Sequence, residues 1–591
     1  MKKVTKLIGL LMAVIMVAGM FACAAPAAEA PAAAAPVIQE APKATEAPAA
    51  EAEAPAEEAA PAEEAAPAGI GPDMLLLPTM ENMGDKFPGS WDNYGLVGRM
   101  MIFSRLLRLN DKLEPVYGDL AADWTQSADG LHYEFTLKDG IKWHDGEAFS
   151  AEDVVCSIQA ALKCGQVNNI MKTAFSKIKG AAEYMESGEL YSDIEGLKAD
   201  GNKVIIDMDT ACGTFLLACA QFNIFPKHII GAYDADTVAS MNTSAFYDWP
   251  IGTGPYKVTE FVPNDYALLE YFPDYFGWDK EPEIKIVKMQ QMTPADYPVN
   301  ALADNIDYFA TNDLGTALAA LENPNYEAFY TDIYFIRFFM WNSHVENDPL
   351  ADINVRRAIV KAIDREALCA SLMPNQATVS NTRVPASFDY YNDNPEIAER
   401  LSYDPEAAKA MLEEAGFDFS RELKFITYNA DQGSANLMDA VCEYLKQVGI
   451  NATWKLITGD LTAQIYGDDA DYNLCYAGLS AMAVEEAYNL YKNETVNSGV
   501  TKGVFPNDYF GMDALIDELA TCVDSARRTE ILKEMQQLDS DEILWHLPLY
   551  SLRNVQVFNK TRLNLPAELV LSNEWSNYER YLEDWSINAA E

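Results

Sequence analysis

Residues 129–162 change from a strand pattern to a helix pattern, and this change constrains the fold more than any other feature of the chain. Four apolar residues alternate with polar ones in the first part: Leu131, Tyr133, Phe135 and Leu137. We expect a hairpin in which this strand turns at Asp139-Gly140 and pairs with 141–143. Ser150 and Asp153 form a capping box. Apolar residues follow it at helical spacing: Val154, Val155, Ile158, Ala161 and Leu162.

Strand and helix patterns continue to alternate along the chain. We expect strands over 204–208 and 333–341, the second of them strongly aromatic. We expect a helix over 354–372, another between the cap Asp404 and Gly416, and a third over 435–448 that ends before Gly449. This alternation predicts an α/β protein with mixed sheets.

The N-terminus has the pattern of an export signal. Three lysines, Lys2, Lys3 and Lys6, precede an apolar run over 7–21. The run is shorter than the roughly 20 apolar residues that a transmembrane helix needs. Ala22-Cys23 resembles a lipoprotein processing site, which predicts a lipid on Cys23. The alternative is ordinary cleavage after Ala24, because Ala22-Cys23-Ala24 also has the small-x-small pattern.

Residues 24–68 are almost wholly Ala, Pro and Glu, with Lys43 the only basic residue. Such a segment lacks the apolar bulk to fold and repels itself, so we expect an extended tether. The predicted division of this part of the chain is therefore an export signal over 1–22 and a lipid-anchored tether over 23–70.

Charge and motif content argue against several classes of function. The chain has 43 basic and 90 acidic residues, a net charge of -47, which disfavours nucleic acid as a partner. It contains no Gly-x-Ser-x-Gly, His-Glu-x-x-His or Walker motif and no Cys-x-x-Cys pair, so we predict no enzymatic activity, no cofactor and no metal site. Eight cysteines follow Cys23. A Cys212–Cys219 disulfide and buried free thiols both remain open for them.

Five stretches, in order, resemble the large extracellular solute-binding proteins of the peptide, nickel and opine type, known as family 5. The signature stretch is Leu137-Lys-Asp-Gly-Ile-Lys-Trp-His-Asp-Gly146, which continues through Phe149-Ser-Ala-Glu-Asp-Val-Val155. The others begin at Gly252-Thr-Gly-Pro-Tyr-Lys-Val258, Asp352-Ile-Asn-Val-Arg-Arg-Ala358, Tyr403-Asp-Pro-Glu-Ala-Ala-Lys409 and Arg527-Arg528. Together they cover nearly everything from about residue 71 to about residue 560. Within the signature we expect Trp143, His144 and Asp145 to be structural, because neighbours on a strand point to opposite faces.

The resemblance implies a periplasmic-binding-protein-like fold of two mixed α/β lobes joined by a hinge, with a third domain packed at the side. Lobe I is expected over 71–104, 250–333 and 560–591, the side domain over 105–249, and lobe II over 334–559. The partners it implies are two permease subunits of an ABC importer with their ATPases. We expect a monomer that is anchored by its lipid to the outer face of the cell membrane.

The same resemblance indicates where ligand would bind. Leu479 stands where peptide-binding members have Trp, beside Ser480, and Met482 falls near the place of their ligand-binding aspartate. Glu485 and Glu486 are the acids that could replace it, and we expect Glu485, the nearer of the two, to select a cationic or amine-bearing ligand. Tyr428 starts a segment without a basic residue before Lys446, which disfavours a carboxylate clamp of the dipeptide type. Trp341 and Asn342, at the end of the aromatic strand, are further candidates for the cleft wall.

Two classes of function follow from the sequence. The first is a receptor that captures a solute by lobe closure and delivers it to an importer; an oligopeptide is the expected ligand, and a nickel chelate, an opine or a sugar is the alternative. The second is a sensory or interaction protein of the cell surface that keeps the fold.

Overall fold

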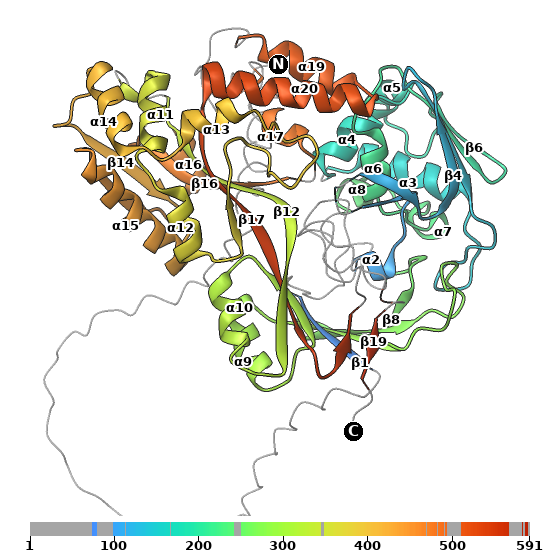
Figure 1. Cartoon of the computed structure of the whole chain (residues 1–591). Helices are drawn as coiled ribbons and strands as arrows, with labels where there is room; N and C mark the ends of the chain where they lie inside the picture. The colour runs from blue at the N-terminus through green and yellow to red at the C-terminus, as the bar shows by residue number, and fades with distance from the viewer. Residues whose placement is uncertain are drawn as a thin grey trace, which may run out of the picture.

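The computed structural model describes residues 74–79, 99–110, 112, 114–165, 167–241, 250–343, 345, 348–467, 470–481, 483–489, 491–492, 510–565, 582 and 585–588. The predicted export signal, Cys23 and the tether lie outside these residues, as does Met482. Among the helices that are described, none is both long and apolar enough to cross a membrane. Figure 1 shows the arrangement of the elements.

A four-stranded antiparallel sheet in the order β4-β5-β7-β6 forms, with helices α3 to α8, what we call the side unit (Figure 1). Helix α3 packs on β6 and β7. The strands are β4 Ala121–Gln126, β5 His132–Leu137, β6 Leu197–Asp200 and β7 Lys203–Asp207. The helices are α3 Ala151–Lys163, α4 Asn169–Phe175, α5 Ala181–Glu186, α6 Phe215–Gln221, α7 Lys227–Ile230 and α8 Ala235–Ala239.

The capping box that precedes α3 is confirmed, but the predicted hairpin is wrong. Asp153 Oδ2 accepts from the backbone N–H of Ser150 at 2.7 Å. Strand β5 pairs with β4 and β7 instead of with 141–143, where only an isolated Lys142–Ala148 bridge forms. The turn after β5 carries the chain into the core, because Trp143 is fully buried there.

A second sheet has the order β1-β10-β9-β8, in which the N-terminal strand β1 runs parallel to β10. A short helix and a two-stranded sheet, α2 and β2-β3, connect it to the side unit. Their bounds are β1 Met74–Thr79, α2 Arg99–Ile102, β2 Leu107–Leu109, β3 Pro115–Gly118, β8 Tyr256–Val262, β9 Tyr266–Tyr271 and β10 Ile286–Gln291.

The third sheet has the order β11-β17-β12-β16-β14-β15, with β13 paired to β17. Its two long strands, β12 and β17, run from the region of β1, α9 and α10 to the region of α11–α20 (Figure 1). Their pairing shifts register between Asp332 and Ile336. The bounds are β11 Tyr308–Thr311, β12 Tyr326–Trp341, β13 Ala377–Val379, β14 Glu422–Thr427, β15 Asn451–Leu456, β16 Leu474–Ser480 and β17 His546–Asn559.

Helices on this sheet complete what we call the C-terminal unit, which comprises β14–β16, the adjoining parts of β12 and β17, and α11–α20. The helices are α11 Ile353–Lys361, α12 Arg365–Leu372, α13 Pro395–Leu401, α14 Pro405–Glu414, α15 Gln432–Gln447, α16 Leu461–Tyr466, α17 Glu485–Asn489, α19 Met512–Thr521 and α20 Ser525–Leu538. A π-turn over Asp539–Ile543 follows α20. At the other end of β12 and β17 lie α9 Tyr297–Leu302, α10 Leu314–Ala320 and the strand pair β18 Leu563–Asn564 with β19 Ser586–Ile587.

Most of the predicted elements of this region are confirmed, with one division. The predicted helix 354–372 is two helices, α11 and α12, because Asp364 accepts a hydrogen bond from the Ala367 N–H and begins a new helix. The predicted apolar face is still buried across the break, at Val355, Ile359 and Ile363. The eight cysteines after Cys23 are all free thiols, and Cys212 and Cys219 form no disulfide. The chain is thus a mixed α/β protein of several packed units, as predicted.

Candidate functional site

The carboxyl ends of β14 and β16 meet at one edge of the third sheet. These two strands are parallel neighbours, and the register aligns Thr427 of β14 with Tyr476 of β16. In open α/β sheets, ligands bind outside the carboxyl ends of the strands. We therefore call 427–429, 478–481 and 483–488, with the side chains that contact them, the candidate site.

Tyr428 lies at this edge. Its side chain is buried, and its hydroxyl accepts a hydrogen bond from the Gly478 N–H at 3.4 Å. Asn429 follows it and donates through Nδ2 to Thr427 Oγ1 at 3.1 Å. The two segments that leave the strands are thus joined by side-chain to backbone hydrogen bonds, which fixes the shape of the edge.

Leu479 and Ser480 are the last two residues of β16 and lie at the same edge of the sheet. Leu479 is half-buried and pairs with Ile336, while Ser480 pairs with Phe335 of β12. The structure therefore brings Tyr428, Leu479 and Ser480 together. Their contact with a ligand stays a prediction.

Glu485 begins the short helix α17 just beyond this edge, and it already has a counter-charge within the chain. Its Oε1 forms an ion pair with Nη2 of Arg528, and only 10% of the Glu485 side chain and 18% of the Arg528 side chain are exposed. A buried carboxylate needs such a partner. A ligand ammonium is therefore not required to balance Glu485, although its contact with ligand remains a prediction.

Trp341 and Asn342 lie at the other end of the β12–β16 pair. Trp341 is opposite Leu474, whereas Phe335 is opposite Ser480, so six residues of extended chain separate the two positions by about 20 Å. Trp341 Nε1 donates to Asp348 Oδ2 at 3.3 Å. Asn342 Nδ2 donates to the carbonyl of Tyr472 at 3.0 Å. Both side chains fasten a loop to the strand end, away from the other four predicted residues.

Arg337 belongs to the candidate site and was missed from the sequence. It is opposite Gly478 on β12, it is 7% exposed, and its Nη1 donates to Asn429 Oδ1 at 3.0 Å. The guanidinium also lies over the rings of Phe335 and Tyr476 at 5.0 and 5.3 Å from their centroids. The sequence did contain a signal for it, because Arg337 is the only charged residue in the aromatic strand predicted over 333–341. A buried cation in a strand is rare unless it is bonded to neighbours.

Electrostatics at the edge are dominated by burial. Desolvation raises the pKa of the Tyr476 hydroxyl, and the positive charge of Arg337 partly opposes that rise. Tyr476 and Tyr550 share a hydrogen bond between their hydroxyls. Burial likewise lowers the pKa of Arg528. These groups are held in fixed pairs, an arrangement suited to recognition by shape and hydrogen bonding.

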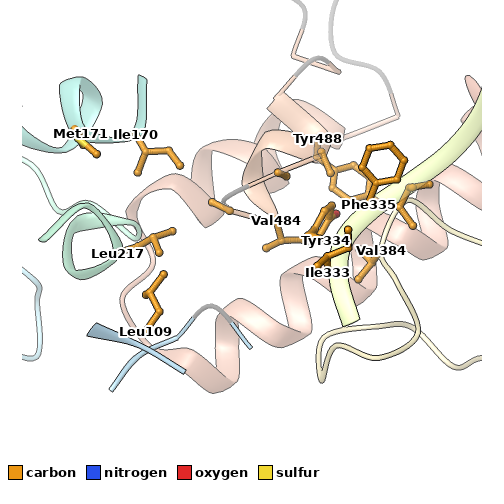
Figure 2. Close-up of a cluster of buried hydrophobic side chains, with 14 of the residues drawn as sticks. Leu109, Ile170, Met171, Leu217, Ile333, Tyr334, Phe335, Val384, Val484 and Tyr488 are labelled. Carbon is orange, nitrogen blue, oxygen red and sulfur yellow. The ribbon is translucent and has the colours of Figure 1, made fainter. Parts of the chain in front are cut away.

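Apolar side chains of the side unit face the candidate site (Figure 2). On one side of this cluster lie Ile170, Met171 and Leu217 of the side unit, with Leu109 of β2, and on the other lie Ile333, Val484 and Tyr488. All are buried, and they belong to one continuous core cluster. The side unit and the C-terminal unit therefore both contribute to the apolar core cluster next to the carboxyl ends of the strands.

Comparisons with known proteins agree on one family. The family model for bacterial extracellular solute-binding proteins, family 5, matches residues 115–498. The oligopeptide-binding protein AppA of Bacillus subtilis is 26% identical over 457 residues, which are 74% of this chain and 78% of AppA. Its structure with a nonapeptide superposes with a TM-score of 0.64, at 19% identity over 87% of this chain and 99% of that one.

Two other solved structures share the fold. The ABC transporter substrate-binding protein CtaP of Listeria monocytogenes has a TM-score of 0.69 at 19% identity, over 88% of this chain and 100% of that one. NikZ of Campylobacter jejuni, in complex with Ni(L-His), has a TM-score of 0.65 at 19% identity over the same shares. Because the family model covers well over half of the sequence, the chain belongs to the bacterial extracellular solute-binding proteins of family 5.

Proposed function

We propose that this protein is the receptor of an ABC importer, and that it captures an oligopeptide at the carboxyl edge of β14 and β16. The observation that carries the proposal is the position of 478–481 and 483–488, which leave this edge and face apolar side chains of the side unit at Val484. A peptide there can be held by main-chain hydrogen bonds, while the apolar side chains accept its side chains.

Binding between two units gives the receptor its mechanism. A ligand that contacts both the C-terminal unit and the side unit binds the closed arrangement better than an open one. It therefore shifts the equilibrium by its differential affinity for the two states. The site has paired charges and a wall of apolar side chains, which supports capture and release without covalent chemistry.

The remaining parts of the proposal concern anchoring and partners. We infer that Cys23 carries a lipid, that the tether holds a monomeric receptor at the outer face of the cell membrane, and that the receptor delivers solute to two permease subunits with their ATPases. Similar folds hold a nonapeptide and Ni(L-His). A receptor for a nickel chelate, an opine or a sugar is accordingly the second candidate, and a sensory protein of the cell surface is the third.

Native mass spectrometry of the protein purified without unfolding tests the ligand class. We expect a distribution of added masses that fragments as peptides. A single added mass that contains nickel, or that fragments as a sugar or an opine, would favour the second candidate.

A matched pair of variants then locates the site. Leu479→Gln changes a half-buried residue of the edge, while Leu318→Gln changes an exposed residue of α10. We expect the first to weaken binding of the co-purified peptides by roughly tenfold, the worth of one apolar contact, and the second to leave it unchanged. Equal affinities in the two variants would place the ligand elsewhere.

A further inference from the structure

The end of α19 and the turn before α20 rest on three loops of the side unit, which contain Gly130, Lys177 and Gly213, and we call this contact the seat. The Gly213 N–H donates to the Ala520 carbonyl at 3.0 Å. The ammonium of Lys177 lies 3.5 Å from the same carbonyl and 3.4 Å from that of Ala211. Close approach also occurs at Gly130, where an added Cβ would lie 2.7 Å from Val523 Cγ1. Backbone groups of the two units therefore meet directly at this seat.

Arg528 lies at the centre of the seat. Its Nη1 donates to the carbonyls of Leu519 and Cys522, at 3.1 and 2.9 Å, in the last part of α19 and the turn after it. Its Nη2 pairs with Glu485 at the start of α17. A Cβ on Gly213 would collide with Nη1 and lie 2.7 Å from both carbonyls. One guanidinium thus touches α17 in the candidate site, the turn after α19 and the loop of the side unit that contains Gly213.

A guanidinium is suited to join three segments because its donors lie in one rigid plane. The carbonyls of Leu519 and Cys522 and the carboxylate of Glu485 fix the plane of the Arg528 guanidinium. If Glu485 moves, Nη1 of Arg528 must move with it, and so must the two carbonyls to which Nη1 donates. The position of α17 and the docking of Gly213 are therefore coupled, and thermodynamic coupling of this kind acts in both directions.

We propose that Arg528 is a positioning residue that transmits the position of Glu485, beyond the ligand edge, to the contact that closes the side unit on the C-terminal unit. The value of this coupling to a receptor rests on the proposed function, since a ligand at the candidate site would use it to favour closure. The coupling itself is a property of the chain and exists without a ligand.

Hydrogen exchange measured by mass spectrometry on the full-length mature protein, without added ligand, tests the coupling. Gly213→Ala places a methyl group against Arg528, and the backbone of Gly213 accepts alanine because it does not have a positive φ. Gly188→Ala is the matched control in the same unit, since an added Cβ there meets no atom within 4 Å. We expect Gly213→Ala to accelerate exchange roughly tenfold at 211–213, 519–523 and 485–488, and the control to change nothing.

Glu485→Ala is the decisive variant, because the ion pair with Arg528 is what joins Glu485 to the seat. We expect it to accelerate exchange at the Gly213 amide also by several-fold, while the amides of β5 keep their wild-type protection and so report an intact fold. Unchanged exchange at Gly213 in this variant would overturn the proposal. That outcome would leave the proposed function standing, because the mass spectrum of the bound ligand is measured independently. Conversely, a receptor for some other solute would still show the coupling.

Discussion

His144 of the signature stretch gives the sharpest test of the structural role that we assign to that stretch. The ring is buried between the two ends of the turn before β8. Its Nδ1 accepts from the Gly252 N–H at 3.2 Å, so its Nε2 carries the proton and donates to the Gly254 carbonyl at 3.0 Å. Protonation of Nδ1 would remove the acceptor. Burial is the main cause that lowers the pKa of His144 from 6.5 to about 4.

The lowered pKa makes stability depend on pH in a defined direction. Between about pH 6.5 and pH 4, the unfolded chain binds a proton at His144 that the folded chain does not bind. The free energy of unfolding therefore falls as the pH falls through this window, by roughly 3 kcal/mol in total. Asp539 acts in the opposite direction, because burial raises its pKa from 3.8 to about 6 and the folded chain then retains the proton.

A comparison with His144→Gln isolates the histidine, because the opposing effect of Asp539 is the same in both proteins. Glutamine can still donate to the Gly254 carbonyl and does not titrate. Urea denaturation from about pH 7 to about pH 4.5 should show that wild type loses roughly 2–3 kcal/mol more stability than the variant. A constant difference between the two proteins over this range would refute the buried, neutral histidine.

Three further outcomes are expected. Arg562→Met should destabilise the fold by about 3–5 kcal/mol in chemical denaturation. The reason is that Arg562 Nε donates to Asp307 Oδ1 at 2.6 Å and that the Asp307 side chain is fully buried. A loss below about 1 kcal/mol would mean that the pair contributes little. Alkylation of the native protein without reductant should modify Cys442 and Cys522 first, since the other described cysteines are buried; rapid modification of the buried thiols would contradict this packing. Cells fed a tagged fatty acid should label wild type and not Cys23→Ser; equally low label in both would favour ordinary cleavage.

Local patterns were predicted well because their causes are local. The capping box at Ser150, the apolar face of α15 and the positive-φ glycine after it, Gly449, each depend on residues within a few turns of one another. Pairing of strands was predicted less well. The hairpin after 131–137 had a suitable turn at Asp139-Gly140, yet β5 found better partners in β4 and β7. Strand pairing is decided by burial of whole faces, which a single turn does not determine.

In the candidate site too, contacts between side chains from distant segments could not be predicted from local patterns. Tyr428, Leu479 and Ser480 could be proposed together because the resemblance related both of their segments to ligand binding. Trp341 could not be excluded, since its distance from them depends on the antiparallel register of β12 and β16.

Glu485 carried the clearest chemical expectation, and its environment depends on Arg528, which a later helix delivers to it. An unpaired acid near a ligand edge implies a cationic ligand, whereas an acid paired with Arg528 implies none. Because the same guanidinium also donates to the carbonyls of Leu519 and Cys522 at the contact with the side unit, the pairing gives Glu485 a place in the coupling that we propose, instead of the role in ligand selection that the sequence suggested.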